Sequence, residues 1–154
     1  MNQEILESLD DSKEELKRAE HLLFVTLKYT RTCEVMKNFM FRLIQTYERG
    51  INTLLDYALE TKRISQIPVA ILIKCNVVRE AFPSRELEGY INFYKILRMI
   101  YKMDYQKREE YRRHICIITD LTGKVFIETN TDDLYLYFLR TQNFIDFIEN
   151  VIKS

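Results

Sequence analysis

The residues best suited to chemistry lie between Tyr90 and Ile118, where a tyrosine-rich segment becomes strongly basic. Aromatic rings beside cations can hold single-stranded RNA, because bases stack on the rings and the cations pair with phosphates. The candidate nucleic-acid-binding residues are Tyr101, Lys102, Tyr105, Arg112 and Arg113. The same pattern is also typical of a helix that faces a core, with tyrosine hydroxyls and basic side chains reaching the edge of that core. The second interpretation is favoured for most of the tyrosines.

Arg108 and His114 are the one pair in this segment whose residue types and spacing resemble a catalytic motif. On a continuous helix six positions advance by about 600°, so the two side chains would point roughly 120° apart. A shared active site therefore requires a break in the helix between them. The alternative interpretation is a salt-bridged helix end without an active site. Glu109–Arg113 and Glu110–His114 are i,i+4 pairs of opposite charge, and cations also stabilise the last turn of a helix.

Charge is balanced over the whole chain but uneven along it. With 23 basic and 23 acidic residues, the chain has no global field that would favour nucleic acid or an anionic membrane. Residues 1–20 contain seven acids and three bases, whereas residues 90–114 contain seven bases and three acids. We expect the two segments to complement each other within the fold or across a dimer.

No motif predicts a metal or a cofactor. The cysteines, Cys33, Cys75 and Cys116, form no C-x-x-C pair, so each is expected to pack as a small apolar residue. His21 is expected to be a partly buried or surface residue. The sequence has no Gly-rich phosphate loop, H-E-x-x-H or G-x-S-x-G motif to support a third function, a nucleotide-binding subunit acting beside a separate enzyme.

Long helices must position these side chains, because 154 residues contain only 3 Gly and 2 Pro. Apolar positions recurring every three or four residues predict helices at 3–30, at 33–62, from Pro68 to about 82, at 85–110 after a Ser84 N-cap, and from a Thr131 cap to the end. A buried strand remains an alternative for 69–78. Gly50, inside the second helix, costs about 1 kcal/mol relative to Ala, which predicts a close approach by another helix.

The pattern changes after His114. Two β-prone runs, 115–118 and 125–128, flank a turn that contains Asp and Gly, and they predict a hairpin. The predicted fold class is therefore mainly α: one domain over 1–154, an antiparallel bundle of about five helices with two long N-terminal helices. A short β-hairpin near 115–128 precedes the C-terminal helix.

Two resemblances follow from these motifs. The segments LKRAEHLLFVT, EYRRHICII and DDLYLYFLRTQNFIDFIE resemble a family of small uncharacterised archaeal proteins, which implies a long helical hairpin, a short helix, a β-hairpin and a C-terminal helix. The spacing of Arg108 and His114 is similar to that of nucleases in the HEPN superfamily of helical bundles. There the Arg would hold the scissile phosphate and the His would assist attack by the 2′-hydroxyl, without a metal and with two copies meeting in a dimer. Glu109 stands where those nucleases usually have Asn, Asp or His.

Broad apolar faces without a convergent catalytic set predict a non-catalytic interaction module that forms a homodimer. The alternative is an HEPN-like RNA-binding protein or metal-independent RNase with catalytic Arg108 and His114, and the resemblance also implies RNA or a nucleotidyltransferase-like protein as partners. The first residues, MNQEILESLDD, are too polar for a signal peptide, and no apolar run reaches membrane-spanning length. We therefore expect a cytoplasmic protein without a membrane partner.

Overall fold

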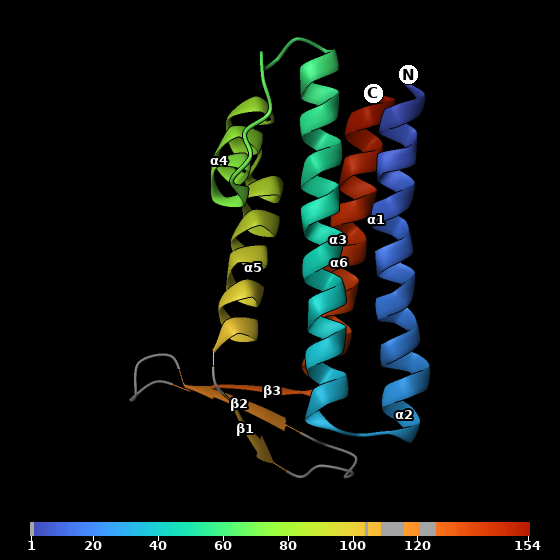
Figure 1. Ribbon diagram of the computed structural model, residues 1–154, viewed down its shortest axis with the longest axis vertical. Helices are drawn as coiled ribbons and strands as arrows, with labels where there is room; N and C mark the ends of the chain where they lie inside the picture. Colours follow the sequence, from blue (N-terminus) through green and yellow to red (C-terminus); the bar gives the residue numbers. More distant parts are fainter. Residues whose placement is uncertain (1, 104, 109–115, 121–125) are drawn as a thin grey trace.

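The computed structural model describes residues 2–103, 105–108, 116–120 and 126–154 (Figure 1). It is mainly helical, as predicted. The helices are α1 (Gln3–His21), which continues through the π-helix η1 (Leu22–Thr26) into α2 (Leu27–Tyr29), then α3 (Cys33–Glu60), α4 (Ile71–Ala81), α5 (Arg85–Lys102) and α6 (Thr131–Lys153). With η1 and α2 taken as the end of α1, the helix count agrees with the prediction.

Helix α3 lies at the centre of the structure and contacts α1, α4, α5 and α6. Figure 1 shows α1, α3 and α6 side by side along the long axis, with α5 on another side of α3 and both chain termini at the end opposite the strands. The largest fully buried side chains of α3 include Phe39, Tyr47 and Leu54. Because apolar residues recur around much of its circumference, α3 buries side chains against several neighbours at once.

Helix α6 approaches α3 closely at Gly50. A Cβ placed on Gly50 would lie 2.7 Å from Cε2 of Phe144 and 2.8 Å from Cδ1 of Ile148. The predicted close approach at this glycine is therefore confirmed, and the partner is α6.

Three strands form one antiparallel sheet in the order β1 (Tyr105–Arg108), β2 (Cys116–Asp120) and β3 (Phe126–Asn130). The helix predicted through 110 is thus wrong at its end, because the chain leaves the helix after Lys102 and extends at Met103. Pairing explains the change: β1 occupies the second edge of β2, so backbone groups of β2 are hydrogen-bonded on both sides. The turn expected between β2 and β3 lies outside the described residues.

Helix starts follow the predictions for α1, α3 and α5 but differ for α4 and α6. The Ser84 hydroxyl accepts a hydrogen bond from the Leu87 N–H (3.3 Å), which confirms the N-cap. Helix α4 begins at Ile71 rather than at Pro68, because the first helical hydrogen bond runs from the Lys74 N–H to the Ala70 carbonyl (2.9 Å). The strand alternative for 69–78 is accordingly wrong.

The cap of α6 is Asn130 and not Thr131. The Asn130 side chain accepts from the Asp133 N–H, and the Asp133 carboxylate accepts from the Asn130 N–H, both at 3.0 Å. This reciprocal capping box satisfies two backbone donors, and it places Thr131 inside the first turn.

Candidate interaction groove between α5 and α6

Of the site residues predicted from the sequence, four lie in the described part of the chain, on α5 and β1. Tyr101 and Lys102 lie in the last turn of α5. Tyr105 and Arg108 lie at the two ends of β1, where their backbones pair with Thr119 and Cys116 of β2. The other three residues, Arg112, Arg113 and His114, lie outside the described residues. A shared cleft for Arg108 and His114 therefore stays a prediction.

Tyr101 belongs to a row of alternating cations and rings on α3 and α5. Its ring stacks on Phe41 with centroids 5.9 Å apart, and Lys37 Nζ lies 4.4 Å from its centroid. Lys37 also donates to the Tyr101 carbonyl. Arg42 lies over the other ring, with its Cζ 5.5 Å from the Phe41 centroid. The row combines rings and cations, but its members other than Tyr101 belong to α3 and not to residues 90–118.

Two tyrosines of the same helix are core residues, as the core interpretation predicts. Tyr94 is fully buried and donates from its hydroxyl to Glu48 Oε2 (2.9 Å); Tyr90 donates to Glu86 Oε1 (2.9 Å). Burial raises the pKa of both phenols, and the carboxylate beside each raises it further; for Tyr90 the pKa reaches about 12. Both hydroxyls are therefore fixed hydrogen-bond donors at neutral pH.

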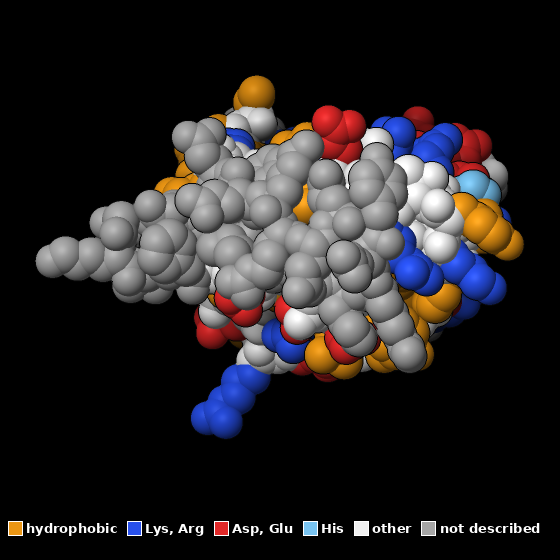
Figure 2. All heavy atoms as spheres, turned by 90° about the horizontal axis from the view of Figure 1, so that it is seen from below, with side chains coloured by type: hydrophobic (Ala, Val, Ile, Leu, Met, Phe, Trp, Pro, Cys, Tyr) orange, Lys and Arg blue, Asp and Glu red, His pale blue; other side chains and the backbone are white. Residues whose placement is uncertain are grey.

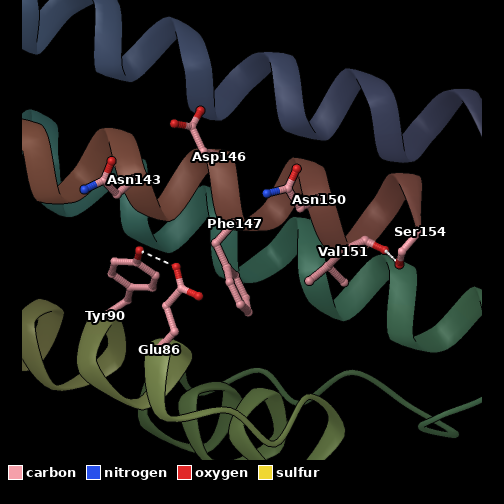
Figure 3. A pocket seen from close by; sticks show the side chains of 8 residues that line it. All are labelled: Glu86, Tyr90, Asn143, Asp146, Phe147, Asn150, Val151 and Ser154. Carbon is pink, nitrogen blue, oxygen red and sulfur yellow. Dashed lines mark hydrogen bonds between the residues drawn. The ribbon is translucent and has the colours of Figure 1, made fainter.

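A groove runs between α5 and α6 on the side of Tyr90 (Figure 3). One hollow in it has a volume of about 490 Å³ and is lined by Glu86, Tyr90, Asn143, Asp146, Phe147, Asn150, Val151 and Ser154. Figure 3 shows the Phe147 ring projecting from α6 towards α5, while Asp146 points away to the other side of its helix. The ring centroids of Tyr90 and Phe147 lie 5.9 Å apart. The hollow thus has an aromatic floor and a polar rim.

A second hollow of about 500 Å³ adjoins the first, since the two share Tyr90 and Asn143. Its lining is more apolar and includes Phe93, Leu136, Tyr137 and Leu139. Leu136 is 60% exposed at this edge. The Arg140 guanidinium covers the floor, 5.8 Å from the Tyr90 ring centroid and 5.4 Å from that of Phe93. The two hollows together form what we call the α5–α6 groove.

The groove exists because α5 and α6 pack mainly on α3 and touch each other along only part of their length. Tyr90 contacts Phe144, at 5.4 Å between centroids, and Phe93 contacts Tyr137, at 5.2 Å. Bulky rings at these positions hold the helix axes apart, and the shallow space above them is left open. The groove carries both signs of charge, Glu86 in the first hollow and Arg140 in the second.

A smaller apolar surface lies where η1 meets the start of α6. Its hollow of about 200 Å³ is lined by Leu23, Phe24, Leu27, Lys28, Arg31, Thr131 and Tyr135. Tyr29 nearby is 79% exposed. Figure 2 shows hydrophobic side chains next to Lys and Arg side chains on this end of the molecule. We call this region the η1 surface; it is smaller than the α5–α6 groove.

The sequence analysis missed a buried carboxylate with three arginines. The Glu15 carboxylate of α1 forms ion pairs with Arg18 on the same helix (3.0 Å between N and O) and with Arg42 and Arg49 of α3 (3.2 Å each). The acids of α1 were expected to face the basic segment 90–114; for Glu15 the complement is instead on α1 and α3. A signal was present: Arg42 and Arg49 are seven residues apart, so they share one face of a helix.

Among the residues that the structure describes, no three or more His, Cys, Asp or Glu side chains gather where they could hold a metal ion. No helix within the described ranges combines the length and apolar character needed to cross a bilayer. Cys33 and Cys75 are buried, as expected for small apolar packing residues. No family model, curated protein or solved structure matches the chain.

Proposed function

We propose that this chain is a non-catalytic, helical-bundle interaction module, with a β-hairpin near 115–128, that forms a homodimer through the α5–α6 groove. The observation that supports this most is the pair of adjoining hollows lined by aromatic side chains of α5 and α6. Apolar grooves between helices bind amphipathic helices, because ridges of apolar side chains fill the groove and exclude water.

A second copy of the chain is the occupant that suits the groove. An isologous contact requires one patch to be complementary to itself. The rim meets this requirement, since Arg140 can face Glu86 of the second copy, and the exposed Leu136 can enter the hollow beside Phe93. Aromatic residues and arginine are also the residues that contribute most to protein interfaces.

Hydrogen exchange measured over a range of protein concentrations tests this function. We expect sedimentation velocity to show a monomer–dimer equilibrium. Amides of α5 and α6 should become protected as dimer forms, while those of the N-terminal half of α1, which does not line the groove, should not change. A strict monomer at all concentrations would remove the basis for the proposal.

RNA binding is the second candidate, favoured by the row of Lys37, Tyr101, Phe41 and Arg42. Rings that alternate with cations suit unpaired bases and their phosphates. We expect Tyr101→Ala to weaken binding of a single-stranded RNA several-fold in a fluorescence titration. The proposed nuclease reaction needs Arg108 and His114, so Arg108→Ala and His114→Ala must each abolish any cleavage. Unchanged cleavage in both variants would exclude the HEPN-like nuclease.

A further inference from the structure

At the contact between α1 and α3, three arginine side chains surround one buried glutamate. The Glu15 carboxylate is 3% exposed and accepts contacts from Arg18, Arg42 and Arg49 at 3.0–3.2 Å. Ser8 and Thr53 are hydrogen-bonded across the same contact at 2.7 Å, and these small side chains let the helices approach closely. All three guanidinium groups are therefore held within reach of a single carboxylate.

The arginines lie on the solvent side of that carboxylate. Their side chains are 52%, 40% and 41% exposed for Arg18, Arg42 and Arg49, whereas Glu15 is almost fully covered. The three guanidinium groups share a single carboxylate as their ion-pair partner. Each guanidinium has five N–H donors, and the contacts to Glu15 use one nitrogen of each.

A purely structural clamp between two helices would not require three cations. Three guanidinium groups this close repel one another, and a second anion above them would relieve the repulsion. The planar donor fork of arginine matches the oxygen atoms of a phosphate. We propose that Arg18, Arg42 and Arg49 form a binding site for a phosphate group, with Glu15 as the positioning residue that holds their guanidinium groups together.

The phosphate can belong to a free phosphate compound or to a nucleic acid strand. Arg42 connects the site to the second possibility, because its guanidinium also lies over Phe41, which stacks on Tyr101. The site does not depend on the α5–α6 groove, which is formed by other helices.

Isothermal titration calorimetry of the full chain with inorganic phosphate tests the site, with chloride adjusted to keep ionic strength constant. We expect measurable binding by the wild type and a dissociation constant at least tenfold weaker for Arg49→Gln. Arg49→Lys keeps the charge but loses the fork, so it should fall between the two. Arg79→Gln on α4 is the matched control and should bind as the wild type does.

Circular dichroism in chloride alone shows whether each variant is folded, and the binding measurement then reports on the site. Phosphate binding that is unchanged in Arg49→Gln, or no binding by the wild type, would overturn the proposal. A uridine oligomer added as competitor identifies the source of the phosphate. Displacement of phosphate from the wild type points to a strand; phosphate binding without displacement points to a free compound.

Discussion

At the scale of single residues, two glycines in helices differ in what surrounds them. Gly50 faces Phe144 and Ile148 of the core, whereas a Cβ on Gly89 would meet only the Nη2 of Arg140, at 3.1 Å. We expect Gly50→Ala to lower the free energy of unfolding by about 1–3 kcal/mol, because the clash outweighs the gain in helix propensity. Gly89→Ala should be neutral or stabilising by up to about 1 kcal/mol, since the Arg140 side chain can move. Urea denaturation compares the two; equal effects would contradict this difference.

Glu15 is a second residue whose removal has a defined cost. Glu15→Gln leaves three guanidinium groups beside a neutral amide, and because these groups are 40–52% exposed, solvent screening limits the loss to about 1 kcal/mol. We expect the free energy of unfolding to fall by roughly that amount in urea denaturation. Glu14→Gln, on the exposed side of α1 next to Lys17, is the control and should change stability by less than about 0.5 kcal/mol. A loss no larger than the control would show that the cluster does not stabilise the α1–α3 contact.

The buried tyrosines predict how stability depends on alkaline pH. The pKa of Tyr90 is raised to about 12 by burial and by Glu86, so the folded protein holds its proton more tightly than the unfolded chain does. Its contribution is complete below pH of about 10, the pKa of an unfolded tyrosine, and is lost as the pH rises towards 12. Tyr90→Phe should therefore make the fall in unfolding free energy over this range shallower than in the wild type. An identical slope would contradict the burial of this phenol.

At the scale of elements, the start of α6 depends on Asn130. Asn130→Ala removes the acceptor for the Asp133 N–H and should destabilise the protein by about 1 kcal/mol. Asn38→Ala, at an exposed position inside α3, should instead be neutral or slightly stabilising because Ala favours helix. Thermal denaturation followed by circular dichroism measures both. A cap variant as stable as the control would mean that the capping box is dispensable.

Elements defined by local pattern could be predicted from the sequence, and those defined by distant pairing could not. The apolar repeat of 33–62 and the Ser84 cap are local, and both correspond to observed features. The residues of β1, Tyr105 to Arg108, continue a helical pattern and become a strand only because β2 supplies a partner. The π-helix η1 also lacks a local signal. Glu15 and Arg49 meet across two helices, which no spacing within one helix reveals.

At the scale of the whole molecule, α3 fixes the positions of the other helices and thereby opens the α5–α6 groove. The broad apolar helix faces that predict a binding partner could be recognised in the sequence. The location of the groove between α5 and α6 could not. Tyr94 and Tyr90 of α5 are both buried, but only Tyr90 also lines the groove. The difference follows from the helix that each side chain meets: Tyr94 bonds Glu48 of α3, whereas Tyr90 packs on Phe144 and Phe147 of α6.

The proposed dimer makes Leu136 the most direct position to test. Leu136 is 60% exposed at the edge of the groove, so Leu136→Asp should leave the fold intact while placing a charge in the interface. Val69, 95% exposed before α4, and Tyr29, 79% exposed near the η1 surface, provide Val69→Asp and Tyr29→Asp as matched controls. Each adds the same charge to an apolar position outside the groove.

The decisive measurement is the dimer dissociation constant of these variants by sedimentation equilibrium. We predict that Leu136→Asp weakens the dimer at least tenfold, which corresponds to about 1.4 kcal/mol, and that Val69→Asp and Tyr29→Asp associate as the wild type does. Dimerisation that survives Leu136→Asp but is lost in Tyr29→Asp would contradict the account and place the interface on the η1 surface.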